Sequence, residues 1–149
     1  MTWDQVESAL RSYIETQWAI SSYSTIELVW ENEPEPDFPR YMSVYIEGTY
    51  SEKSGYGGVG KHNSIEAGII FFHSFTPSGE GKEEAVKLVV TMAGILQLKT
   101  IESVIDLEGS NPPSPAIYGT DDRLLPNPHP GGNYYRCSGS VPFIVRSGI

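Results

Sequence analysis

The sequence predicts an α/β fold, more narrowly α+β: a mainly antiparallel, mixed sheet with two helices packed on one of its faces. Apolar residues recur at helical spacing in two segments, from about Trp3 to Ala19 and from about Lys82 to Leu98. The other segments alternate β-branched and aromatic residues with polar ones, the period of half-buried strands. The resulting order α-β-β-β-α-β-β favours antiparallel neighbours with both helices on the same side.

The first helix begins with a capping-box pattern, in which Thr2 caps the helix and Gln5 lies three residues later. Its apolar positions share one face: Trp3, Val6, Leu10, Tyr13, Ile14 and Trp18. A serine-rich stretch ends the helix near Ala19. The short run from Thr25 to Trp30 is then typical of a strand.

Two longer strands follow a proline-rich loop, the first from Tyr41 to Tyr50 and the second from Asn63 to Phe75. In the second, one face carries Ile65, Ala67, Ile69, Phe71, His73 and Phe75, while Ile70 and Phe72 make the other face apolar as well. A strand that is apolar on both faces is expected in the middle of its sheet.

The second helix follows the turn from Pro77 to Gly81, and acidic residues lie at its amino end, where the helix dipole favours them. Ser103 to Glu108 resumes a strand pattern. A long proline-rich loop occupies about residues 109–133, where regular structure is not expected. The last strand is predicted from Tyr134 to Val145, and Pro142 within it favours an edge strand or a bulge.

The composition indicates a single domain spanning residues 1–149, with 39% hydrophobic residues to form its own core. No apolar run approaches the ~18 residues of a membrane span, and residues 1–7 lack the pattern of a signal peptide. We therefore expect a protein made in the cytoplasm that contacts no membrane. A single cysteine, Cys137, excludes an internal disulfide and a cysteine-based zinc site. The net charge of −9 disfavours a protein that grips phosphate backbones.

The segment from Ser51 to His62 is too long and too rich in glycine for a tight hairpin turn, so we expect a projecting arm. Gly55 to Gly60 matches G-x-G-x-x-G, but a dinucleotide site needs a helix after these glycines, and here a strand pattern follows. A flexible contact arm is the favoured interpretation over a phosphate site. Its candidate oligomer or partner contacts are Lys53, Gly55, Tyr56, Gly57, Gly58, Val59, Gly60 and Lys61.

An acidic string precedes the second strand: Glu31, Glu33, Glu35 and Asp37. It lacks the spacing and central glycine of a calcium loop, so an acidic loop facing solvent, a partner or a lumen is favoured over a metal site. The three histidines form no H-x-x-x-H or H-E-x-x-H pair, no G-x-S-x-G elbow exists, and Cys137 is expected to be packed in a strand. No catalytic, cofactor or metal site is predicted.

Several short motifs occur along the chain in a fixed order, flanking the glycine-rich arm: Val29-Trp30-Glu31-Asn32-Glu33-Pro34, Phe38-Pro39, Ala67-Gly68-Ile69-Ile70-Phe71-Phe72, Pro77-x-Gly79-x-Gly81 and Val141-Pro142-Phe143. In this order, from Trp3 to about Val145, the chain resembles the tail terminator, or tail completion, proteins of long-tailed bacteriophages, similar to the lambda-type terminator family. The arm itself departs from any pattern that can be aligned with the family.

The resemblance implies a structural virion protein and not an enzyme. Such a protein forms a hexameric ring on the head-proximal end of the tail tube, ends tube polymerisation and provides a docking surface for head completion or neck proteins. It implies no cofactor, assembly in the host cytoplasm, and DNA that passes through the ring without specific binding. Trp30, Asn32, Pro34, Gly79 and Gly81 match motif positions that are architectural in the family.

Two alternatives remain open at this point. One is another head-tail joining, neck or tail tube component. The other is a small ligand-binding or enzymatic α/β domain. A ring would make part of the acidic excess available to line its bore, where negative charge would let DNA slide past.

Overall fold

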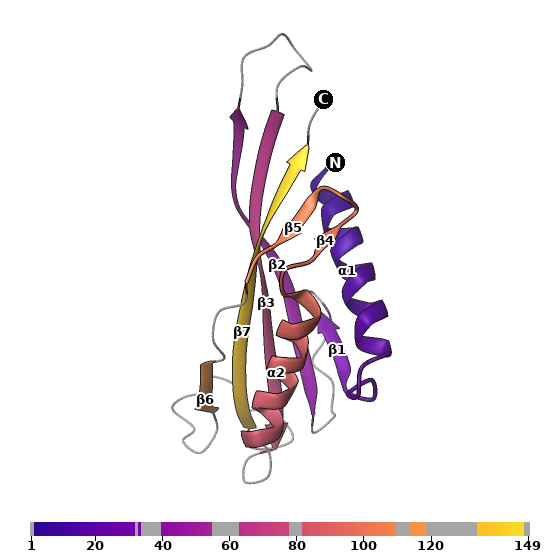
Figure 1. Cartoon of the computed structure of the whole chain (residues 1–149). Coiled ribbons are helices and arrows are strands. Elements are labelled where there is room, and N and C mark those ends of the chain that lie inside the picture. The colour runs from indigo at the N-terminus through magenta and orange to yellow at the C-terminus, as the bar shows by residue number, and fades with distance from the viewer. Residues whose placement is uncertain are drawn as a thin grey trace.

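The computed structural model describes residues 2–31, 33, 40–54, 63–77, 82–109, 114–118 and 134–147, and these form two helices and one seven-stranded sheet (Figure 1). The elements in chain order are α1 (Trp3–Ala19), β1 (Glu27–Trp30), β2 (Tyr41–Ser54), β3 (Asn63–Pro77), α2 (Lys82–Leu96), β4 (Thr100–Ile101), β5 (Ile105–Leu107), β6 (Ser114–Tyr118) and β7 (Tyr134–Ser147).

The sheet is mixed but mainly antiparallel, as predicted. Its strands follow the order β1-β2-β3-β7-β5-β4, and β6 pairs with β7 beside this path. Only the β1–β2 pair among the described strands is parallel. The prediction that β3 lies centrally is confirmed, since β3 pairs with β2 from Asn63 to Phe75 and with β7 from Ser64 to Pro77.

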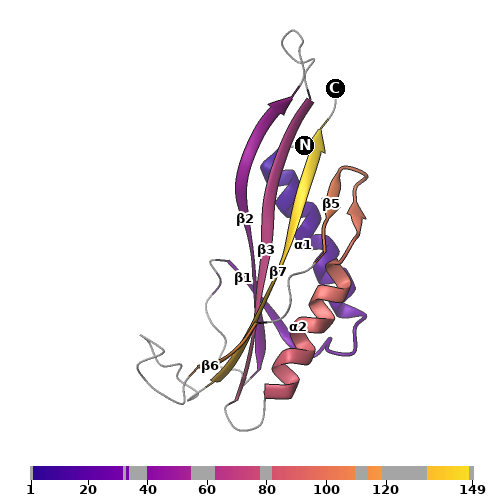
Figure 2. The same cartoon turned by 60° about the vertical axis from the view of Figure 1, so that its left-hand side comes forward.

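Both helices lie on one face of the sheet, which confirms the predicted arrangement (Figure 2). Alternate residues of the three long strands point into the core between sheet and helices, because successive side chains of a strand face opposite sides. The Tyr13 hydroxyl of α1 donates to the Ile95 carbonyl of α2 at 3.0 Å and ties the helices together. The largest fully buried side chains are Phe72, Phe143, Leu10, Ile14, Met42, Ile70, Leu88, Met92, Leu96, Ile105, Val6 and Val44.

The bounds of α1 agree with the prediction because its signal is local. Thr2 and Gln5 form the capping box in both directions: the Gln5 amide donates to Thr2 Oγ1 at 3.4 Å, and the Thr2 amide donates to Gln5 Oε1 at 2.9 Å.

The bounds of β1, β3, α2 and β7 each differ from the predicted ones by two residues at one end. Three other predictions need larger adjustment. The β2 strand continues to Ser54, past the predicted end, because its backbone pairs with β3 as far as Asn63. The strand predicted from Ser103 to Glu108 is shorter, Ile105–Leu107 (β5), and it forms a hairpin with the unpredicted β4, whose turn holds Glu102 and Ser103 at positive φ without a glycine. Strand β6 lies inside the proline-rich loop for which no regular structure was predicted.

Pro142 lies in an interior strand, and the prediction of an edge strand or bulge for it is wrong. It pairs with Ile69 of β3 in regular register. Its carbonyl accepts the Glu108 amide at 2.9 Å, so the missing N–H of the proline also points toward the β5 side. The β5 ladder ends at the Leu107–Phe143 pair. The proline therefore lies where no ladder donor is required on that side.

Candidate functional site

The β2–β3 hairpin extends past the helices (Figures 1 and 2), and the first four residues of the predicted arm, Ser51–Ser54, belong to β2. Strands of 14 and 15 residues span about 45–50 Å at 3.3 Å per residue, whereas the 17 residues of α1 span about 26 Å. Neither helix alone is as long as the hairpin, and β2 and β3 continue past the amino end of α1 (Figure 1). Lys53 lies in this extension, opposite Ser64, and the other predicted contacts, Gly55 to Lys61, lie outside the described residues.

Two glycines face each other where the hairpin leaves the helix layer. Gly48 pairs with Gly68, and the ladder shifts register by one residue between Gly48 and Tyr50. A Cβ at Gly48 would lie 3.3 Å from the Trp3 ring, and one at Gly68 would lie 2.5 Å from Cζ of Phe143. The missing side chains let the first turn of α1 and the Phe143 ring pack closely on the sheet at the base of the arm.

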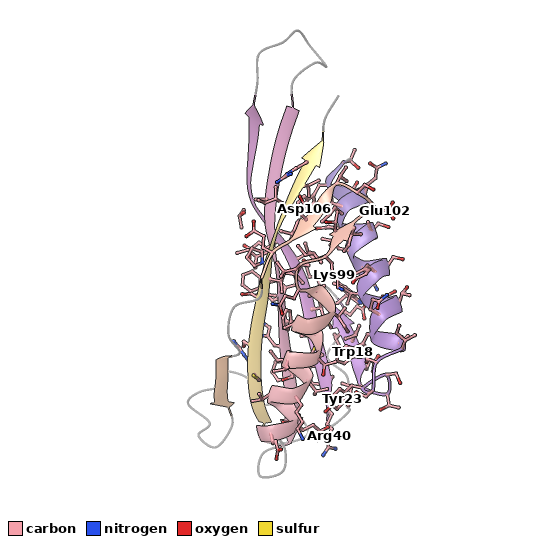
Figure 3. All side chains as sticks on the ribbon, viewed as in Figure 1. Trp18, Tyr23, Arg40, Lys99, Glu102 and Asp106 are labelled. Carbon is pink, nitrogen blue, oxygen red and sulfur yellow. The ribbon has the colours of Figure 1, made fainter. Side chains whose placement is uncertain are left out.

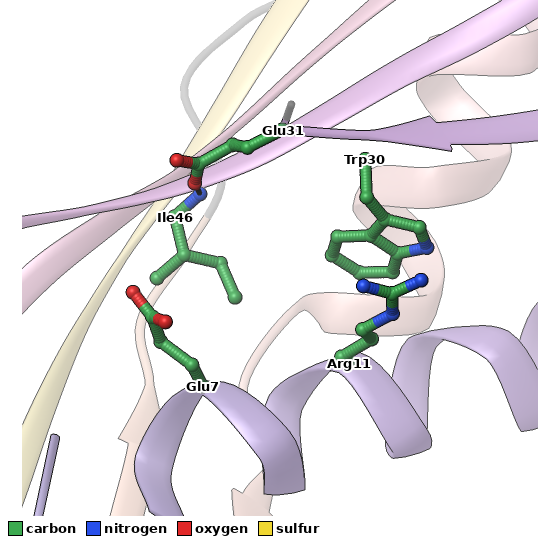
Figure 4. A pocket seen from close by; sticks show the side chains of 5 residues that line it. All are labelled: Glu7, Arg11, Trp30, Glu31 and Ile46. Atoms are coloured by element: carbon green, nitrogen blue, oxygen red, sulfur yellow. Dashed lines mark hydrogen bonds between the residues drawn. The ribbon is translucent and has the colours of Figure 1, made fainter. Parts of the chain in front are cut away.

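The acidic string before β2 is in part tied to the chain's own framework (Figure 4). The Glu31 carboxylate accepts the Ile46 amide at 2.8 Å, which extends the β1–β2 ladder beyond the end of β1. Glu33 lies 3.1 Å from the Arg11 guanidinium in an exposed ion pair. Glu35 and Asp37, the other two predicted acidic residues, lie outside the described residues.

Arg11 lies over the ring of Trp30, with its guanidinium carbon 5.0 Å from the ring centroid. Its hydrogen bond to Glu15, together with the nearby carboxylate charges, raises the pKa of Arg11. A pocket of about 220 Å³ opens here between Glu7, Arg11, Trp30, Glu31 and Ile46. Glu7 accepts the indole N–H of Trp3 at 2.7 Å. The polar groups that line this pocket are therefore bonded to other groups of the chain, and their contacts connect α1, β1 and β2.

The sheet face opposite the helices is the feature that the sequence did not single out as a surface. Tyr45 stacks on Phe71 with ring centroids 5.0 Å apart, and Tyr41 stacks on Phe75 at 4.7 Å. Within the described part of the chain, no helix covers this face (Figure 2). The alternation of Ile69, Phe71, His73 and Phe75 indicates an apolar face on this strand. It does not indicate whether residues of the same chain or of another molecule pack on that face.

His73 lies on this aromatic face beside Tyr45, and its Nδ1 is 2.7 Å from the Ser138 hydroxyl. Burial, with a smaller effect from the positive charge of Arg136, lowers the pKa of His73 to about 4. The ring is therefore neutral near pH 7. Cys137, on the helix-facing side, is buried as predicted, and burial raises the pKa of its thiol. A buried thiol with a raised pKa is a poor nucleophile.

A second pocket, of about 300 Å³, lies on the uncovered face at the base of the arm. Ile69, Pro142 and Ile144 contribute apolar groups, and Thr49 and Glu108 contribute polar ones. Across the described residues, no group of three or more His, Cys, Asp or Glu side chains is placed to hold a metal ion. Neither described helix is long and apolar enough to cross a membrane.

Comparison of the sequence with models of protein families and with curated proteins finds no match. Among solved structures, one chain whose name states no function is similar in fold, with a TM-score of 0.65 and 13% sequence identity. The similarity covers 100% of this chain and 99% of that chain. At this identity the likeness concerns the fold alone, and it extends over the whole domain.

Proposed function

We propose that this chain is a tail terminator of a long-tailed bacteriophage, a structural protein that forms a ring on the head-proximal end of the tail tube. The ordered motifs from Trp30 to Phe143 carry the resemblance on which the proposal rests. Its ring would end tube polymerisation and offer a docking surface to a head completion or neck protein. The alternative within the same class is another head-tail joining, neck or tube component.

The geometric observations that support this proposal best are the extended hairpin and the outer face of the sheet. A β-hairpin extends past the helix layer, and an aromatic sheet face has no cover from a described helix. Exposed apolar surface that one chain does not cover commonly marks a site of protein association. Repeated contacts between two different surfaces of identical subunits close into a ring when the rotation permits.

The net charge of −9 fits a ring through which DNA passes without being held. Glu31 and Glu33 are bonded to the chain's own groups, but Glu33 is only partly shielded, with 40% of its side chain exposed. The proposal therefore includes a ring bore that is lined in part by carboxylates of this acidic segment. A ring structure in which all carboxylates of this segment lie on the outer wall would reject it.

The decisive experiment removes the gene from the phage or prophage genome that encodes it and images the particles by electron microscopy. We expect tails of irregular, extended length and heads without tails, with normal virions restored by the wild-type gene on a plasmid. A major tail protein gene is expected nearby. Normal tails joined to heads after removal of the gene would reject the proposed function.

A further inference from the structure

Two large apolar residues are exposed on the outward side of α2 and just past its end. Val90 is 52% exposed, and Leu98, just past the end of the helix, is 73% exposed. Gly94 lies between them, four residues after Val90 and hence on the same face. Together, Val90, Gly94 and Leu98 are here termed the α2 stripe.

Gly94 lowers the stability of the helix in which it lies. A glycine within a helix destabilises it by about 1 kcal/mol relative to alanine, yet a Cβ at Gly94 would meet nothing within 4 Å. Packing among the described residues thus gives no reason for a glycine here. Close approach of another molecule would explain the glycine, because a missing side chain lets a second surface reach the helix backbone.

The opposite side of the molecule offers a matching surface, a row that crosses the uncovered sheet face at the second pocket. Glu47 pairs with Ile69, and Ile69 pairs with Pro142. Glu108 follows next, with its amide bonded to the Pro142 carbonyl. These residues, Glu47, Ile69, Pro142 and Glu108, are here termed the sheet row. Its centre is apolar and each end carries a carboxylate.

The two surfaces are similar in size and opposite in charge at their ends. Neighbouring strands lie about 4.8 Å apart, so the sheet row spans about 14 Å. The helical stretch from Lys87 to the end of α2 at Leu96 spans about 14 Å at 1.5 Å per residue, and Lys99 lies three residues further along the chain. Lys87 and Lys99, both exposed, flank the α2 stripe, and Figure 3 shows Lys99 beside the end of the helix. Among the described residues, Lys87 forms an ion pair with exposed Glu83 at 3.2 Å, a kind of contact that contributes little and can be exchanged.

We propose that the α2 stripe of one copy packs on the sheet row of the next copy. Lysines would meet carboxylates at both ends, and Gly94 would lie over the apolar centre. The two surfaces lie on opposite sides of the molecule, because the buried face of α2 packs on β3 and β7. The contact is therefore heterologous and propagates from copy to copy, as a ring requires. This inference rests on the self-association in the proposed function.

Disulfide trapping in the full chain tests the contact. Gly94→Cys and Ile69→Cys are prepared separately, mixed and oxidised. We expect a cross-linked dimer in the mixture and none with either variant alone, because a heterologous contact does not place a residue opposite its own copy. Thr49→Cys, exposed at the same pocket, replaces Ile69→Cys if the latter unfolds.

The controls are the wild-type chain, whose Cys137 is buried, and Ser12→Cys on the exposed side of α1 mixed with Ile69→Cys. No dimer should form in either. Absence of dimer in the Gly94→Cys and Ile69→Cys mixture, or equal dimer with Ser12→Cys, overturns the contact.

A second measurement uses light scattering with mass determination. Leu98→Glu is expected to shift the oligomer toward the monomer. Ile20→Glu changes an equally exposed apolar residue, 76% exposed and away from the contact, and should leave the mass unchanged. An oligomer that persists in Leu98→Glu overturns this contact but leaves a ring possible through other surfaces. A wild-type chain that stays monomeric also overturns it, whereas the proposed function is judged separately by tail length in the phage.

Discussion

At the scale of single residues, the structure depends on positions where a side chain is missing. Gly68 lies between the Phe143 ring and the Glu47 carbonyl, which a Cβ would approach to 2.5 and 2.7 Å. The ring can move, but the carbonyl belongs to the paired strand and cannot move without disturbing the ladder. The helical Gly94 has open space around it. The sequence shows both as glycines and does not tell them apart.

Gly68→Ala should therefore destabilise the fold by about 1–3 kcal/mol, the usual cost of overpacking. Gly94→Ala should stabilise the monomer by about 1 kcal/mol through helix propensity. Urea unfolding of dilute protein, followed by circular dichroism, measures both. Equal effects of the two substitutions would contradict the packing described for Gly68.

His73 provides a pH-dependent prediction. Its pKa is lowered in the folded protein to about 4 from the ordinary 6.5, so the unfolded chain binds the extra proton first as the pH falls. The contribution of neutral His73 to stability is thus complete above pH 6.5 and is lost progressively as the pH falls toward 4. NMR titration of the imidazole should give a midpoint near pH 4, with His73→Gln identifying the signal. A midpoint near 6.5 would contradict the burial of this ring.

At the scale of elements, predictions from local signals succeed and those that depend on pairing partners fail in part. The capping box and the apolar face of α1 lie within one segment, so both ends of the helix were predicted correctly. The polar end of β2, Ser51–Ser54, has no strand pattern of its own. It is ordered as a strand through pairing with β3, which is itself held by β7. The break between β4 and β5 depends on positive φ at Glu102 and Ser103, which no glycine signals.

The arm allows a deletion that the strand register makes well defined. Ser54 pairs with Asn63, so removal of Gly55 to Gly60 leaves Lys61 and His62 as a two-residue connection, a length that suits a hairpin. We expect the shortened chain to fold with nearly unchanged thermal stability but to fail in ring assembly or in tail completion. Circular dichroism, light scattering and complementation of the gene deletion measure these three properties.

A control for this deletion replaces Lys61 and His62 in the shortened chain by Asn and Gly, the preferred pair for such a turn. The same loss of assembly in this variant would show that the missing arm, and not a strained turn, is responsible. Full tail completion by either shortened chain would reject a role for the arm.

At the scale of the whole molecule, the described elements form two layers, and both described helices lie on the same face of the sheet. The core lies between the helices and the other face, where buried residues of all three long strands meet. The outer face of the sheet carries the half-buried rings of Tyr45, Phe71 and Phe75, and Tyr41 beside them is fully buried. Association of copies would bury the part of these rings that is still exposed.

The charge of the molecule leads to a prediction about DNA. With a net charge of −9, the chain should show no measurable binding to short duplex DNA at physiological salt, because too few cations are available to release counterions. Fluorescence anisotropy with a labelled duplex measures this, with a basic DNA-binding domain as positive control. Binding that weakens steeply with salt would contradict a passive conduit.

The sequence alone determined the two helices, the three long strands and the central place of β3, because each leaves a periodic signal within its own segment. The tertiary structure alone decided which apolar face of β3 packs in the core, since Ile70 and Phe72 face the helices while Phe71 and His73 face outward. It also decided that Pro142 lies inside the sheet and that the Glu31 carboxylate accepts the Ile46 amide of β2. These outcomes depend on partners distant in the chain, and a local pattern does not specify which distant groups will meet.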